Sequence, residues 1–150
     1  MHLIMYTSEY CGDHRAMPED FTNILNTARK DNPARDITGM LFYDQGKFIQ
    51  IIEGEKQELD KLMDILNSDV RHKNIQVLIN AAVPQRELKD WNMEAFDISS
   101  HIGKDWALLS EFRDAYLESF KVSGIQLTNW IRHFVKDHDK VKRLLSIPSP

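Results

Sequence analysis

The segment FIQIIEG, residues 48–54, places a polar amide in the middle of an apolar run. Gln50 lies between two isoleucines, and side-chain alternation along a strand puts it on the same face as Phe48 and Ile52. A primary amide has four hydrogen-bonding sites, and burying it without partners costs about 1 to 3 kcal/mol. Gln50 is therefore expected to face a buried partner, which is either another side chain or a ligand.

Two further polar residues lie next to apolar segments of predicted strands or helices. Tyr6 follows three apolar residues on a short predicted strand, and Asn32 ends a predicted helix. In a split βαβ sheet the first and third strands are central neighbours, so Gln50 can accept a hydrogen bond from the Tyr6 hydroxyl. If both residues face the helices, the remaining amide groups of Gln50 are free for a ligand between those helices. The alternative is a Tyr–Gln pair that satisfies itself within the core.

Four other residues would surround such a ligand. Ile24 and Leu66 would line a slot between the two helices, and Arg71 and His72 follow the second helix. An apolar slot with a few convergent polar groups is how planar ligands are held. The alternative for Ile24 and Leu66 is plain core packing, and the alternative for Arg71 and His72 is a solvated loop.

The elements that must position these residues follow from hydrophobic periodicity and turn signals. The residue before proline avoids the α region, so Asn32-Pro33 is expected to end the first helix. Gly46 suits the hairpin turn DQGK. The predicted strands cover residues 3–7, 37–43, 47–53, 74–83 and 91–98, and the predicted helices cover residues 18–31 and 55–67. This order predicts an α+β, ferredoxin-like (split βαβ) fold, a five-stranded sheet with both helices on one face.

The sequence divides near residue 98. Residues 1–98 contain the predicted sheet, and residues 99–150 follow as an extension with two amphipathic helices. Leu127, Trp130, Ile131 and Phe134 form the apolar stripe of the second of these helices. Because amphipathic helices do not stand alone in water, we expect the pair to cover the other face of the sheet.

Charge is distributed unevenly over the 150 residues. The chain carries a net charge of −4, while residues 121–150 hold six basic and two acidic residues, which leaves −8 for residues 1–120. An acidic body argues against nucleic-acid binding. A single cysteine, Cys11, fits a reducing compartment, and no apolar run is long enough to span a membrane. We expect a cytoplasmic protein without membrane insertion.

Common catalytic and metal-binding motifs are missing from the sequence. The six glycines form no G-x-G-x-x-G or phosphate loop, the histidines have no metal-ligand spacing, and no G-x-S-x-G segment occurs. The sequence therefore predicts no metal site and no enzymatic activity.

Residues 1–98 resemble the BLUF domains, blue-light sensors that use flavin. The resemblance is carried by Tyr6 and by the segments DNPARDITGMLFY, FIQIIEGE, DVRHKNI and WNMEAF in unbroken order. It implies a flavin held edge-on between the two helices, usually FAD, with FMN and riboflavin as alternatives. It also implies the following cofactor-binding residues: Tyr6, Ile24, Asp31, Asn32, Gln50, Leu66, Arg71 and His72.

The resemblance further implies a mechanism. On blue-light excitation Tyr6 would supply an electron and a proton through Gln50, and the flavin would return to its oxidised form. Gln50 alone would remain rearranged, by rotation or tautomerisation. Trp91 and Met93 on the fifth strand would relay this change to the C-terminal helices. The output would be a change in a homo-oligomer or in binding of a downstream protein.

Two other functions compete with a photoreceptor. One is a flavin-binding or other small-ligand enzyme on the same scaffold, which the lack of an evident substrate-directed catalytic group disfavours. The other is an RNA-recognition module, which shares the split βαβ plan. The aromatic and basic signature of such modules is missing, and the body is acidic.

Overall fold

The structure, a computed structural model, describes residues 1–44, 46–86, 88–90 and 92–97. Each helix follows a strand, and a hairpin joins the two strands between the helices. The strands are β1 (His2–Tyr10), β2 (Thr38–Asp44), β3 (Lys47–Gly54), β4 (His72–Ala82) and β5 (Asn92–Asp97), and the helices are α1 (Met17–Asp31), the 3₁₀ turn η1 (Pro33–Arg35) and α2 (Lys56–Ser68).

The five strands form one sheet in the order β4-β1-β3-β2-β5. β1 pairs antiparallel with both β3 and β4, and β2 pairs antiparallel with β3. Gly46, in the turn between β2 and β3, has a φ of 86°, which glycine adopts without the steric penalty of a side chain. The predicted ferredoxin-like order is confirmed, and β3, which carries Gln50, is the middle strand.

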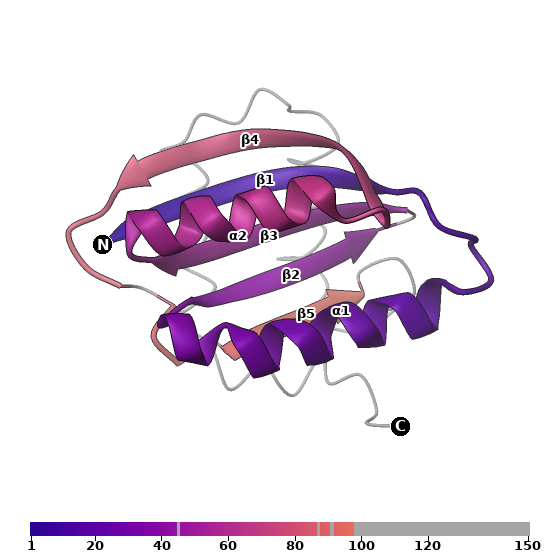
Figure 1. The fold of residues 1–150 in the computed structure, drawn as a ribbon, viewed down its shortest axis with the longest axis horizontal. Coiled ribbons are helices and arrows are strands. Elements are labelled where there is room, and N and C mark those ends of the chain that lie inside the picture. Colours follow the sequence, from indigo (N-terminus) through magenta and orange to yellow (C-terminus); the bar gives the residue numbers. More distant parts are fainter. Residues whose placement is uncertain (45, 87, 91, 98–150) are drawn as a thin grey trace, which may run out of the picture. The chain divides into compact units, whose positions relative to one another are not determined.

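Both helices pack on the same face of the sheet (Figure 1). α1 begins with a proline in its first turn, followed by two acidic residues, and ends with two basic residues, so its charges complement the helix dipole. Between the helices and the sheet lies a continuous apolar core. Its members from the central strands and the two helices include Ile4, Tyr6, Leu41, Phe48, Ile52, Phe21, Ile24, Leu25, Leu59 and Met63.

The end of α1 differs from the expected conformation. The helix ends at Asp31 as predicted, but Asn32 keeps α-helical angles (φ −64°, ψ −40°) even though a proline follows. The chain tightens into η1, and Asp36, which follows it, lies in the left-handed region. The backbone carbonyl of Asn32 accepts from the amides of Arg35 and Ile37, and these two bonds offset the steric cost before Pro33.

Two strands extend beyond their predicted limits. Residues 8–10, expected in a loop, belong to β1 because Ser8 pairs with Phe48 and Tyr10 pairs with His72. The same pairing starts β4 at His72, which was expected to lie in a loop before the strand. Local polarity suggested a loop, but pairing with strands distant in the sequence decides the structure here.

Two further expectations lie outside the described residues. These are the pair of C-terminal helices in residues 99–150 and the position of Trp91. β5 itself begins one residue after Trp91, at Asn92.

Two residues of α2 give a test of the core. Leu59 is fully buried, whereas Ile65 on the same helix is 51% exposed. Leu59→Ala should lower the free energy of unfolding by about 2 to 5 kcal/mol, because it removes buried methyl groups and leaves a cavity. Ile65→Ala should change it by less than about 1 kcal/mol. Urea unfolding followed by circular dichroism compares the two, and equal losses would contradict the packing described.

Candidate functional site

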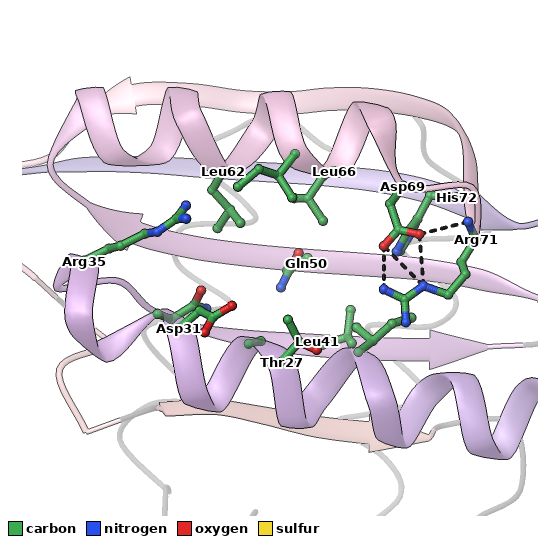
Figure 2. A pocket seen from close by; sticks show the side chains of 14 residues that line it. Thr27, Asp31, Arg35, Leu41, Gln50, Leu62, Leu66, Asp69, Arg71 and His72 are labelled. Carbon is green, nitrogen blue, oxygen red and sulfur yellow. Dashed lines mark hydrogen bonds and ion pairs between the residues drawn. The ribbon is translucent and has the colours of Figure 1, made fainter.

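A slot opens between α1 and α2 and has Gln50 on its floor (Figure 2). Its volume is about 120 Å³. α2 contributes Leu62 and Leu66 to one wall, and α1 contributes Thr27 and Asp31 to the other. The complete lining consists of Ile24, Thr27, Ala28, Asp31, Asn32, Arg35, Leu41, Gln50, Leu62, Ile65, Leu66, Asp69, Arg71 and His72.

Tyr6 and Gln50 lie directly opposite each other on the paired strands β1 and β3. The Tyr6 hydroxyl donates a hydrogen bond to Oε1 of Gln50, and both side chains are buried. Burial raises the pKa of the Tyr6 phenol above its ordinary value of 10, so the hydroxyl keeps its proton at neutral pH. The expected contact between the two side chains is confirmed.

The other end of the Gln50 amide is also engaged. Its Nε2 donates to Sδ of Met93 on β5 at 3.0 Å. This contact differs from the expectation that the rest of the amide is free for a ligand. One N–H of the amide and one lone pair of Oε1 remain after the two bonds are counted.

Asn32 is placed to meet a ligand. Its side chain is only 3% exposed and lines the slot. The Asn32 backbone is hydrogen-bonded to its neighbours, but its side-chain amide makes no hydrogen bond to any described residue. The amide opens into the slot and has no partner among the described residues, so it fits a polar ring edge there.

An ion pair closes one end of the slot. The Arg71 guanidinium donates three hydrogen bonds to the Asp69 carboxylate, the shortest at 2.6 Å (Figure 2). Hydrogen bonding to Arg71 lowers the pKa of Asp69, and the same bonds raise the pKa of Arg71. Both groups are therefore charged at neutral pH, and the pair adds little net charge to the slot.

His72, beside this pair, is a buried neutral side chain. Its Nδ1 lies 3.0 Å from Oγ of Ser8, and among the described residues its Nε2 has no hydrogen-bond partner. Burial lowers the pKa of His72 below its ordinary value of 6.5, with a smaller contribution from the Arg71 charge. Its ring also packs 5.0 Å from that of Phe48.

The slot brings together seven of the eight residues expected to bind a cofactor: Ile24, Asp31, Asn32, Gln50, Leu66, Arg71 and His72. Tyr6 does not line it but reaches it through Gln50. Asp31 is exposed at the rim. Their roles in binding stay predictions.

Sequence reasoning missed several lining residues. Asp69 could have been found as the acidic residue two positions before Arg71, where a carboxylate can pair with the guanidinium. Leu62 could have been found one helical turn before Leu66. Arg35 and Thr27 carried no such signal in the sequence.

The described residues give two further negative findings. Within them no cluster of three or more His, Cys, Asp or Glu side chains could hold a metal ion. No helix in that part of the chain is long and apolar enough to cross a membrane.

The fold and the slot together define a small α+β domain with a slot between two helices on one face of the sheet. Residues 1–94 match the model of the BLUF family, described as sensors of blue-light using FAD. The chain therefore belongs to the BLUF family, a family of blue-light sensors that use flavin.

Known relatives agree with this assignment. The chain is 30% identical over 97 residues to the photoactivated adenylate cyclase subunit beta of Euglena longa, covering 65% of this chain and 11% of that protein. It is 30% identical over 78 residues to the blue light- and temperature-regulated antirepressor BluF of Escherichia coli K12, covering 52% of this chain and 19% of that protein. The chain thus spans less than a fifth of the length of these two relatives.

A solved structure shows the same fold. The dark-state structure of BlrB, a BLUF protein, matches with a TM-score of 0.72 and 23% identity, covering 91% of this chain and 96% of that one.

His72 leads to a test by pH. Because burial lowers its pKa, the folded protein binds the imidazole proton at lower pH than the unfolded chain does. The unfolded state then holds more protons below pH 6.5, so the free energy of unfolding should fall as pH falls through that value. Asp69, whose pKa is also lowered, contributes only below its ordinary value of 3.8.

His72→Gln removes the titrating group and should flatten this slope. Urea unfolding at several pH values from about 7.5 to about 5 measures it, and one proton corresponds to at most about 1.4 kcal/mol per pH unit. A slope identical in both proteins would show that His72 is not buried in the neutral form.

Proposed function

We propose that Tyr6 and Gln50 form the light-operated switch of this chain and that the slot above them holds the flavin. The observation that carries the proposal is the continuous chain of hydrogen bonds from Tyr6 through Gln50 to Met93. It connects a buried phenol, the floor of the slot and the last described strand.

The lining of the slot suits a flavin ring. Aliphatic side chains of both helices would contact its two planes, and the unpaired amide of Asn32 would bond its polar edge. Nε2 of His72 is a buried polar atom that has no hydrogen-bond partner among the described residues. A slot of about 120 Å³ is smaller than the 300 Å³ or more of typical ligand pockets. Half-exposed Leu62 and Leu66, on the α2 wall, would therefore have to move away from the α1 wall as the ring enters.

The form of the flavin is proposed to be FAD. Arg35 lies at the end of the slot opposite Arg71 (Figure 2). Unlike Arg71, its guanidinium makes no ion pair or hydrogen bond with any described residue. A free guanidinium suits a phosphate group, which FAD and FMN carry and riboflavin lacks. The family description, which specifies FAD, favours the dinucleotide.

A bound flavin supplies absorption of blue light and, once excited, strong oxidising power. Tyr6 would be the buried donor of an electron to the excited flavin, and its proton would leave along the hydrogen bond to Oε1 of Gln50. Both return to Tyr6 when the excitation ends, so the chain is neither oxidised nor reduced overall. What persists is the changed arrangement of the Gln50 amide, which acts as a two-state element.

This cycle consumes no substrate, so we propose a sensor rather than an enzyme. Residues 1–98 would form the sensory domain, and residues 99–150 would carry the output through Trp91 and Met93. The basic, amphipathic character of residues 126–145 fits an output by contact with another protein or a second copy of the chain. We propose that it acts in the cytoplasm.

The switch pair gives the most direct test. Tyr6→Phe removes the donor hydroxyl and Gln50→Leu removes the amide, so each variant should bind flavin yet lose the reversible light-induced shift of its absorption spectrum. Tyr43→Phe makes the same chemical change at a half-buried tyrosine outside the slot and should keep the shift. A normal shift in either switch variant would refute the mechanism.

Asn32 gives a separate test of binding. Asn32→Ala should weaken flavin affinity by about 2- to 10-fold, since a hydrogen bond contributes about 0.5 to 1.5 kcal/mol. Asn26→Ala, at an exposed position of the same helix, should leave the affinity unchanged. Titration followed by flavin fluorescence measures both affinities. Equal dissociation constants for Asn32→Ala and the unaltered protein would show that the Asn32 amide does not bond the flavin.

A further inference from the structure

Met93 has a backbone conformation that its residue type disfavours. Its φ is 51°, in the left-handed region, although it lies within β5. The other non-glycine residues with positive φ are Asp36 and Asn74, among the described positions, and both are of types that tolerate this region. Methionine gains nothing locally from such angles, so contacts with other elements must hold Met93 there.

Two hydrogen bonds from two different elements hold this residue. Nε2 of Gln50, on β3, donates to the Met93 sulfur at 3.0 Å. Nε of Arg29, on α1, donates to the Met93 backbone carbonyl at 3.2 Å. The first bond fixes the side chain and the second fixes the strained backbone, and Met93 itself is 1% exposed.

The bond to the sulfur depends on which way the Gln50 amide is turned. The Tyr6 hydroxyl donates to Oε1, so Nε2 faces Met93, and a thioether sulfur can only accept. An amide rearranged by rotation would present an oxygen to that sulfur, and two acceptors make no hydrogen bond. The bond from Arg29 to the Met93 carbonyl would remain and oppose relaxation of the Met93 backbone.

We infer that Arg29 is a positioning residue that holds β5 in its kinked conformation at Met93 and sets how readily the Gln50 switch releases it. This inference rests on the proposed function. Arg29 is well placed for the role, because Ala28 on α1 and Asn32 just after it line the slot while Arg29 reaches β5. One helix thus contacts both the ligand site and the strand that responds.

The test compares three variants at neighbouring positions of α1. Arg29→Ala removes the donor. Arg29→Gln keeps an N–H donor the same number of bonds from the backbone but removes the charge. Lys30→Ala removes a cation at the next position, whose side chain makes no ion pair or hydrogen bond with any described residue.

Hydrogen exchange of the backbone amides of residues 92–97, in the dark and with flavin bound, is the first measurement. Arg29→Ala should speed exchange there by about 2- to 10-fold, as expected from the loss of one hydrogen bond. Arg29→Gln and Lys30→Ala should stay within twofold of the unaltered protein. The second measurement is the spectral recovery after illumination, which Arg29→Ala should slow because the kinked conformation forms less readily.

Two outcomes would overturn the inference. One is an Arg29→Ala protein with unchanged exchange or unchanged recovery, and the other is an Arg29→Gln protein that behaves like Arg29→Ala. Either result would leave the proposed function intact if the unaltered protein still shows its reversible shift. If that shift is missing in the unaltered protein, the proposed function fails instead, and exchange in the dark still reports whether Arg29 holds β5.

Discussion

The hydrogen bond between Tyr6 and Gln50 constrains the arrangement of the whole site. The Tyr6 hydroxyl donates to the carbonyl oxygen of Gln50, and this bond directs that end of the amide toward β1. The other end must then face Met93, whose sulfur can only accept. A single bond between two central strands thereby sets the orientation of the slot floor and the contact with β5.

The surrounding core shields the Tyr6–Gln50 hydrogen bond from water and holds both side chains in position. Phe48, on the same face of β3 as Gln50, is fully buried and packs against the rings of Tyr10, Phe21, Tyr43 and His72. Such dense packing leaves the two switch side chains few alternative rotamers. The chemistry of the site therefore depends on the ring packing of Phe48, which itself does not line the slot.

Sequence patterns were informative where a residue's position follows from periodicity. Alternation along β3 and the split βαβ order were enough to place Gln50 beside Tyr6, and helical spacing placed Ile24 and Leu66 on facing walls. The patterns failed where distant partners decide the conformation. Asn32 stays helical before a proline because two later amides bond its carbonyl, and His72 is a strand residue because Tyr10 pairs with it.

The positive φ of Met93 could not be predicted for the same reason, because nothing in its neighbourhood along the chain favours it. Its causes are side chains on α1 and β3, brought near only by the completed fold. The amide of Asn32 is similar. Its burial and its lack of a hydrogen-bond partner among the described residues become visible only in the folded structure. Features that serve function here are those that local sequence preferences would not select.

The register between β1 and β3 also bears on how this domain can change during evolution. Tyr6 and Gln50 face the helices together because the two strands pair in a fixed register from His2–Gly54 to Glu9–Lys47. Residues added in the segment 11–16, between β1 and α1, would leave that register untouched. A single residue added within β1 would turn one part of the strand over and separate the two side chains. Lineages of this domain can therefore lengthen their loops freely, while the two central strands admit substitutions but not insertions.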